Sequence, residues 1–310
     1  SISAAQLNAL GVIKMEYLNQ TNAAKLNGDV TDWLYSKGYT LMTGGTTVSG
    51  IETSNTVAAG TGTTKIVAGK SAVTITGSNS AETIDGSSKA DVITGAGGSD
   101  TIDGHEGNDI VNYLLTADLF ANQVAVDSVT GGDGNDIITV GTSGTPFSIA
   151  NDDIWTRINT VETIKANANI ANVVIALDAS AATAGINKVD LSLVTGTQNI
   201  IDVSEFSTPT TLIGATTTGV VDIIGGSGAD TIIAAAGGGI IIAGGGLDKV
   251  TLGAGVDVVV LGTTADSLDT ITGFTGGPTG DKIGLTEAIN GGDMVGINVV
   301  DIQAMDFALD

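Results

Sequence analysis

The sequence predicts a mainly β protein, a β-solenoid with a short α-helical N-terminal region. The 310 residues include 45 glycines, and aromatic residues make up only 4%. The apolar residues are mostly Ala, Val, Ile and Leu, which favours thin, repetitive β-structure over a bulky globular core. A nine-residue pattern of glycine turn, acid and β-type pair recurs in the middle of the chain. Residues 1–42 stand apart, since they hold three of the four tyrosines and a helical periodicity.

Residues 1–42 are expected to form two or three short helices. Leu7, Leu10 and Leu18 fit one helical face, Asn22 fits an N-cap, and Gly28 fits the residue that stops a helix. A hydrophobic cap on the end of the β-stack is the favoured role. A docking module for another subunit or for the cell surface is the alternative.

Residues 43–310 are expected to form one continuous β body, because only three prolines occur and no flexible linker interrupts it. KIVAG and SAVTITG at 65–77 alternate like strands. The segment 113–130 breaks the pattern, with a short helix expected at Thr116–Gln123. Residues 140–224 keep the strand-like composition with irregular spacing, and 261–310 form a C-terminal capping or export segment. Regular repeats are expected at 77–112, 131–139 and 225–260.

The regular repeats are nonapeptides with an acid in the sixth place and Ile or Val in the eighth. From Gly77 they read GSNSAETID, GSSKADVIT, GAGGSDTID and GHEGNDIVN; Gly131 opens GGDGNDIIT. From Gly225 they read GGSGADTII, AAAGGGIII, AGGGLDKVT and LGAGVDVVV. The acids in the sixth place are Glu82, Asp91, Asp100, Asp109, Asp136, Asp230, Asp248 and Asp257. Six residues make a glycine-permitted turn and three make a short strand whose central side chain packs inward.

This spacing predicts calcium sites between stacked turns. Two nonapeptides complete one coil, so turns on the same side lie one sheet spacing apart, about 4.8 Å. Calcium takes six to eight oxygen ligands at roughly 2.3–2.6 Å, which an ion between two turns can collect from carboxylates and backbone carbonyls. The predicted partners are Glu82 with Asp100, Asp91 with Asp109, and Asp230 with Asp248. Asp257 would face Gly239, so that site would lack a second carboxylate. The alternative is a solenoid in which the aspartates only cap turns.

The nonapeptides resemble the calcium-binding repeat of RTX proteins, G-G-x-G-x-D-x-U-x. The resemblance implies a parallel β-roll with Ca²⁺ held between the turns, in a protein exported by a type I secretion system. DTITGFTGGPTGDKIGL at 269–285 is similar to the segment that often follows RTX arrays. VVDIQAMDFALD at 299–310 is similar to an uncleaved C-terminal export signal; an ordinary capping strand is the alternative for both segments.

Charge and residue content exclude several functions. The formal charge of −23 argues against nucleic acid and against anionic membrane surfaces, and no apolar run is long enough for membrane insertion. Millimolar calcium outside cells would suit such a chain, which is expected to stay largely unfolded without it. His105 is the only histidine and is expected on a solvated turn, so neither a catalytic triad nor a multi-histidine zinc site is available. TKIVAGKS at 64–71 lacks the first glycine of a P-loop. We therefore expect no enzyme.

Two functions from different classes remain. The first is a calcium-dependent structural protein that self-assembles into a surface layer or filament on the bacterial cell surface; INTVETIKA at 158–166 is also similar to surface-layer proteins. The second is a secreted adhesin that recognises glycan or a surface. Assembly is favoured over adhesion. A secreted hydrolase with an unrecognised site in 113–224 is a third, weaker hypothesis.

Overall fold

The fold is described by a computed structural model for residues 47–49, 56–59, 63–69, 71–170, 172–261, 269–285 and 298–299. These residues form a parallel β-solenoid with two short helices, which confirms the predicted fold class. The helices expected in residues 1–42 and the export signal expected at the end of the chain lie outside the described residues, apart from Val299 in the last strand. Contacts within the chain divide it into two compact units. Unit 1 contains the described residues up to Val111 together with Asp127–Gly134, and unit 2 contains the remainder.

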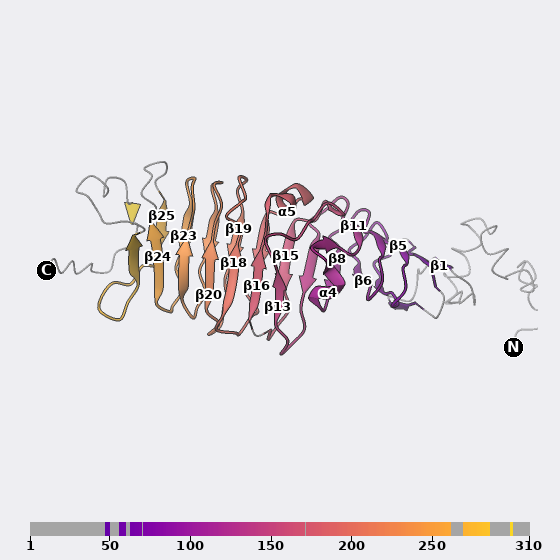
Figure 1. Cartoon of the computed structure of the whole chain (residues 1–310), viewed down its shortest axis with the longest axis horizontal. Coiled ribbons are helices and arrows are strands. Elements are labelled where there is room, and N and C mark those ends of the chain that lie inside the picture. Colours follow the sequence, from indigo (N-terminus) through magenta and orange to yellow (C-terminus); the bar gives the residue numbers. More distant parts are fainter. Residues whose placement is uncertain are drawn as a thin grey trace, which may run out of the picture. The chain divides into compact units, whose positions relative to one another are not determined.

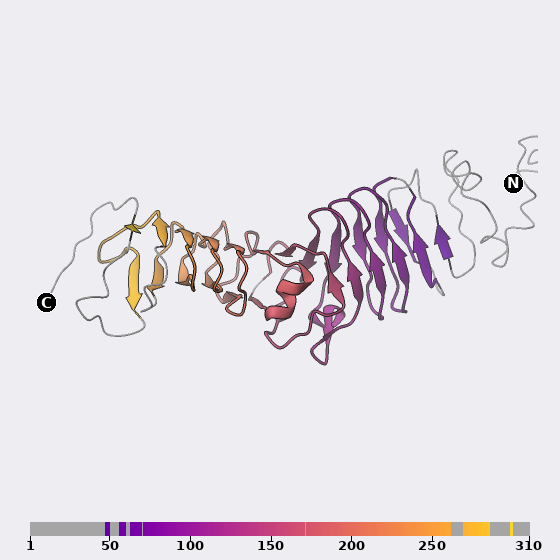
Figure 2. The same ribbon diagram turned by 90° about the horizontal axis from the view of Figure 1, so that it is seen from above.

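Unit 1 winds with two short parallel strands in each coil (Figure 2). One sheet contains β1 (Thr47–Ser49), β3 (Lys65–Val67), β5 (Thr83–Asp85), β7 (Thr101–Asp103) and β11 (Ser128–Thr130). The other contains β2 (Thr56–Ala58), β4 (Thr74–Thr76), β6 (Val92–Thr94) and β8 (Ile110–Tyr113). Thr83 pairs with Thr101, and Val92 pairs with Ile110. One coil in this array is therefore two nonapeptides long, as the repeat predicts.

The core of unit 1 is a stack of central strand residues. Ile84 and Ile93, each in the eighth place of its repeat, are completely buried, and Ile66 and Ile75 continue the two stacks. A three-residue strand has one side chain facing inward, so each strand adds one apolar layer. The core is thin because each coil has only two such strands.

Unit 2 repeats this plan with two sets of parallel strands (Figure 1). One contains β12 (Ile137–Val140), β15 (Thr163–Ala166), β17 (Lys188–Asp190), β19 (Thr211–Ile213), β21 (Thr231–Ile233), β23 (Lys249–Thr251), β25 (Thr270–Thr272) and β27 (Asn298–Val299). The other contains β13 (Phe147–Ile149), β16 (Val173–Ala176), β18 (Asn199–Asp202), β20 (Val221–Ile224), β22 (Gly239–Ile242), β24 (Asp257–Leu261) and β26 (Lys282–Leu285). The two-residue strand β14 (Ile158–Asn159) lies in contact with helix α5 (Ala179–Ala184).

The coils of unit 2 differ in length, and the longer ones hold bulkier side chains. Ile137 pairs with Thr163, whereas Thr231 pairs with Lys249, so the coil shortens towards the second array. Trp155, Phe147 and Phe206 are buried in the region of longer coils. Helix α5 uses some of the extra length. Asp178 caps its N-terminus by accepting hydrogen bonds from two backbone N–H groups, and Gly185 ends it with a φ of 113°.

The segment that interrupts the first array forms a small insertion of its own. The predicted helix at Thr116–Gln123 begins where expected but ends early, since α4 spans Thr116–Leu119. Phe120 instead has an extended backbone and begins β9 (Phe120–Ala121), which pairs antiparallel with β10 (Val124–Ala125). Its ring also lies edge-on to Trp155, with centroids 5.0 Å apart, and this packing competes with a further helical turn. Neither described helix has the length or apolar character needed to cross a membrane.

Candidate calcium-binding columns

The acids in the sixth place of the repeats line up in columns, one residue for each coil. The residue lies at the start of a strand or just before it, so parallel pairing of the strands brings successive acids together. In unit 1 the columns hold Glu82, Asp100 and Asp127 before one sheet, and Asp91 and Asp109 before the other. In unit 2 they hold Asp230, Asp248 and Asp269 before one sheet, and Asp257 and Asp281 at the other. The structure therefore brings together Glu82 with Asp100, Asp91 with Asp109, and Asp230 with Asp248, as the repeat predicts.

Each carboxylate links its own turn to the preceding coil. The backbone N–H of Glu82 donates to Oδ1 of Asp100 at 2.8 Å, eighteen residues along the chain. The same bond joins Asp91 to Asp109 at 2.8 Å, and Asp230 to Asp248 at 2.7 Å. The carboxylates in the columns thus sit at the boundary between coils, where an ion would have to bind.

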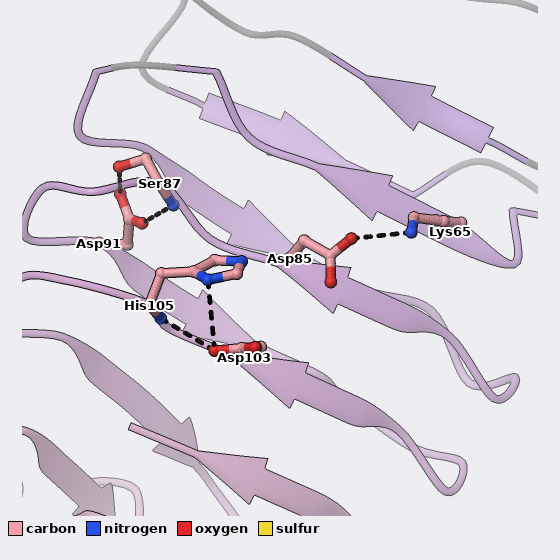
Figure 3. A network of polar contacts seen from close by, with 6 residues as sticks. All are labelled: Lys65, Asp85, Ser87, Asp91, Asp103 and His105. Carbon is pink, nitrogen blue, oxygen red and sulfur yellow. Dashed lines mark hydrogen bonds and ion pairs between the residues drawn. The ribbon is translucent and has the colours of Figure 1, made fainter. Parts of the chain in front are cut away.

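The second carboxylate oxygen faces the turn of its own repeat. Oδ2 of Asp91 accepts a hydrogen bond from the backbone N–H of Ser87 at 2.5 Å, and the Ser87 hydroxyl donates to Oδ1 (Figure 3). Oδ2 of Asp230 accepts from the Gly226 N–H at 2.9 Å. These bonds are the turn caps of the alternative interpretation, and they coexist with the columns. Turn capping therefore does not decide whether an ion also binds.

Two buried carboxylate oxygens bear more directly on whether an ion binds. Among the described residues, Oδ2 of Asp100 and Oδ2 of Asp248 are buried without a hydrogen-bond partner. Both residues are at most 1% exposed. A buried carboxylate oxygen without a donor is costly, and a bound cation would remove that cost.

Burial and crowding raise the pKa values of these carboxyls. Burial raises the pKa of Asp100 from 3.8 to about 7, and the charges of Asp127 and Glu82 contribute in the same direction. Burial likewise raises the pKa of Asp248 to about 7, with Asp269 and Asp230 adding to the effect. Neighbouring carboxylates in a column therefore repel one another, and either protonation or a bound cation reduces this repulsion.

Glycines in the first place leave room at the same boundary. A methyl carbon built on Gly77 would lie 2.3 Å from the carbonyl oxygen of Gly95 on the next coil and 3.0 Å from Oε2 of Glu82. At Gly225 the corresponding distances are 2.1 Å to the Ala243 carbonyl oxygen and 2.8 Å to Oδ2 of Asp230. A carbonyl of one coil and a carboxylate of its neighbour thus converge where a larger residue would put a side chain. Any residue but glycine would fill this position.

This donor set fits calcium better than a transition metal. Carboxylate and carbonyl oxygens are the ligands that calcium prefers, and they come from two turns at each boundary. No group of three or more His, Cys, Asp or Glu side chains gathers in the described part of the chain. Calcium would therefore be held by pairs of carboxylates together with carbonyls, and its charge would stabilise the stacking of the coils.

Asp136 and Asp257, the remaining predicted ligands, also lie at column positions. Asp136 is buried, and its backbone N–H donates to Oε2 of Glu162 at 2.7 Å, so Glu162 continues the column in unit 2. Asp257 lies opposite Gly239, as predicted. On its other side, however, the backbone N–H of Asp257 donates to Oδ1 of Asp281 at 2.9 Å. The boundary with the preceding coil therefore has no second carboxylate opposite Asp257, as predicted, whereas Asp281 supplies one at the boundary with the following coil.

Some charged side chains of unit 1 outside the columns form partly exposed pairs. Lys65 pairs with Asp85 at 2.8 Å, and Nδ1 of His105 lies 3.7 Å from Asp103 (Figure 3). His105 is exposed with a φ of 70°, which confirms its place on a solvated turn. Exposed pairs of this kind contribute little stability.

Four column acids were not predicted as partners from the nonapeptides: Asp127, Glu162, Asp269 and Asp281. They lie outside the regular repeats, and the first three lack the glycines that mark the frame, whereas Asp281 has Gly276 and Gly277 in the first two places but no glycine in the fourth. Each is followed two residues later by a buried or half-buried apolar residue, as in DSV, ETI, DTI and DKI. This shorter pattern of acid, any residue and apolar residue was the signal that could have found them.

Comparison with known families agrees with this geometry. The model of the RTX calcium-binding nonapeptide repeat matches four segments, at residues 58–88, 76–111, 126–142 and 222–241. Together these cover less than a third of the chain. No curated protein and no solved structure gives a significant match. The chain thus carries RTX repeats of the calcium-binding type, and calcium is the ion that its acid columns are arranged to hold.

Proposed function

We propose that this chain is an extracellular structural protein that assembles, when calcium is present, into a surface layer or a filament. RTX repeats mark it as a calcium-binding protein of an extracellular kind. Export by a type I system and a place on the bacterial cell surface belong to the proposal. We assign it no catalytic activity.

The observation that carries the proposal is a set of exposed apolar side chains on the insertion of unit 2. Leu114 and Leu115 are 47% and 49% exposed, and Val124 is 38% exposed. Val124 forms a β-bridge with Ile154, which is 41% exposed. The bridge brings the exposed side chains of Val124 and Ile154 together, and exposed apolar side chains that lie together can mark contacts with other molecules. A second copy of the chain would bury them.

Charge explains why calcium would trigger the assembly. The formal charge of −23 opposes association of identical chains. Calcium bound in the columns lowers this charge and fixes the coils that carry the insertion. The same ion thereby orders the monomer and reduces repulsion between monomers.

Light scattering and electron microscopy of the purified chain, in millimolar calcium and in EGTA, test the proposal. We expect large ordered particles only with calcium. The double substitution Leu114→Ser and Leu115→Ser should prevent the particles while leaving the circular dichroism spectrum in calcium unchanged. Leu247→Ser is the matched control, because Leu247 is 63% exposed but lies in the second array. A wild-type chain that folds with calcium and stays monomeric would refute assembly.

A secreted adhesin is the second candidate, and the same exposed residues are compatible with it. An adhesin would remain a monomer in calcium and be retained by an immobilised glycan. The substitutions at Leu114 and Leu115 would then abolish retention on the glycan and leave the protein monomeric.

A further inference from the structure

One column position in unit 2 holds a neutral amide in place of an acid. Asn199 begins strand β18 and is 1% exposed. Its Oδ1 accepts a hydrogen bond from the backbone N–H of Val173, on the preceding coil, at 2.9 Å. This is the bond that Asp100 accepts from Glu82 and that Asp248 accepts from Asp230. Asn199 therefore occupies the position of a column carboxylate.

The NH₂ group of the Asn199 side chain links carbonyl oxygens of two turns, as a bound cation would. Its Nδ2 donates to the carbonyl oxygen of Gly196, in its own turn, at 2.6 Å. It also donates to the carbonyl oxygen of Val220, on the following coil, at 2.8 Å. One NH₂ group thus joins carbonyl oxygens from two successive turns. A calcium ion between turns would join the same kinds of oxygen, but it would need a carboxylate to balance its charge.

The neighbouring column positions carry no charge either. Register places Val173 before Asn199 and Val221 after it. In the other column, Thr210 precedes β19, and its hydroxyl donates to the carbonyl oxygen of Thr208 at 3.0 Å. The repulsion that burdens Asp248 and Asp269 has no counterpart at these positions.

We propose that the Asn199 carboxamide is an internal substitute for calcium, and that the coils around β16, β18 and β20 stay folded without the ion. The chain then contains a calcium-independent segment next to the calcium-dependent second array. This refines the expectation that the calcium-free chain is largely unfolded. Calcium-driven folding would extend from a segment that is already formed.

Hydrogen exchange with mass spectrometry on the full chain, in EGTA and in calcium, tests this directly. In EGTA we expect the amides of Val173–Ala176 and Asn199–Asp202 to remain protected. The amides of Thr231–Ile233 and Lys249–Thr251 should lose protection and recover it on calcium addition. Equal loss of protection in both pairs of strands would overturn the proposal.

The substitution Asn199→Asp tests the role of the amide itself. It keeps the shape and the bond from Val173, but it replaces the donor with a charged oxygen facing two carbonyls. We expect the protection factors of β16 and β18 in EGTA to fall by about tenfold or more, since unpaired buried polar groups are costly. Calcium should restore them. Gln198→Glu is the control, because it makes the same amide-to-carboxylate change at the exposed residue next to Asn199, outside the column. A variant that is as well protected in EGTA as the wild type would refute the assignment to Asn199.

Discussion

Replacing Asp248 by asparagine should have opposite effects on stability with and without calcium. Asp248 is buried, Oδ1 accepts the hydrogen bond from Asp230, and Oδ2 has no partner among the described residues. Asparagine has the same shape and can keep the bond to Oδ1. It removes the buried charge, and its NH₂ can donate to carbonyls as the one at Asn199 does. The substitution also removes a predicted calcium ligand.

The magnitude follows from the raised pKa. Burial raises the pKa of Asp248 from 3.8 to about 7 in the calcium-free protein. The folded state then binds the proton more tightly than the unfolded state, so this stabilising contribution is complete below about pH 4 and is lost as the pH rises through about 7. At about 1.4 kcal/mol for each pH unit, the buried charge costs up to about 4 kcal/mol above neutrality. In EGTA at about pH 8, Asp248→Asn should therefore be more stable than wild type by an amount up to this limit.

Urea unfolding followed by circular dichroism measures both arms of the prediction. In EGTA the free energy of unfolding of the wild type should rise as the pH is lowered from about 8 to about 5, and Asp248→Asn should reduce that dependence. In millimolar calcium the variant should be less stable than wild type, because ligand charge sets calcium affinity and bound ion stabilises the folded state. Glu205→Gln removes an exposed charge in unit 2 and should change neither arm. A variant that is destabilised to the same extent in EGTA and in calcium would contradict both the buried charge and the ligand role.

Two further substitutions probe the turns. Gly225→Ala places a methyl group 2.1 Å from the Ala243 carbonyl oxygen and should weaken calcium binding, measured by isothermal titration calorimetry. Gly245→Ala is the control, because its methyl group meets no atom closer than 3.6 Å, and it should bind calcium as the wild type does. Equal affinities of the two variants would show that the glycine in the first place does not shape the site. Asp178→Ala removes the N-cap of α5 and should cost about 0.5–2 kcal/mol in thermal unfolding, with calcium and without it. A loss seen only in calcium would show that α5 belongs to the calcium-dependent part.

The nonapeptide frame was sufficient to predict the coils of both arrays. Its period fixes two strands for each coil, and the eighth residue must face inward because a three-residue strand has one inward side chain. Ile232 and Val250 are buried as this requires. The pairing of Asp230 with Asp248 follows from the same period, since residues one coil apart lie side by side in parallel strands.

The frame failed where coil length changes. Asp281 lies twenty-four residues after Asp257, so a search at eighteen residues cannot find it. Asp127 lies twenty-seven residues after Asp100 because the insertion intervenes. Helix α5 was missed because its six residues are mostly alanine, and alanine also recurs in the preceding non-helical sequence, at Ala166, Ala168 and Ala176. In each case the chain keeps the register of the sheet and places the extra residues in the turn.

Glycine turns and column acids therefore have separable roles in this chain. The repeat at 234–242 has glycines in the fourth, fifth and sixth places but no acid, and β22 still pairs in register with β20 and β24. Asn199 has neither an acid nor a regular nonapeptide around it, and its coil is bridged by an amide. The glycine pattern thus determines where the backbone can turn tightly, whereas the side chain at the column position determines what holds one coil to the next. A column of acids requires an external cation, and a column of neutral groups does not. Dependence on calcium should therefore follow the acids at the column positions, including Asp269 and Asp281 beyond the last regular repeat, rather than the number of glycine-rich repeats.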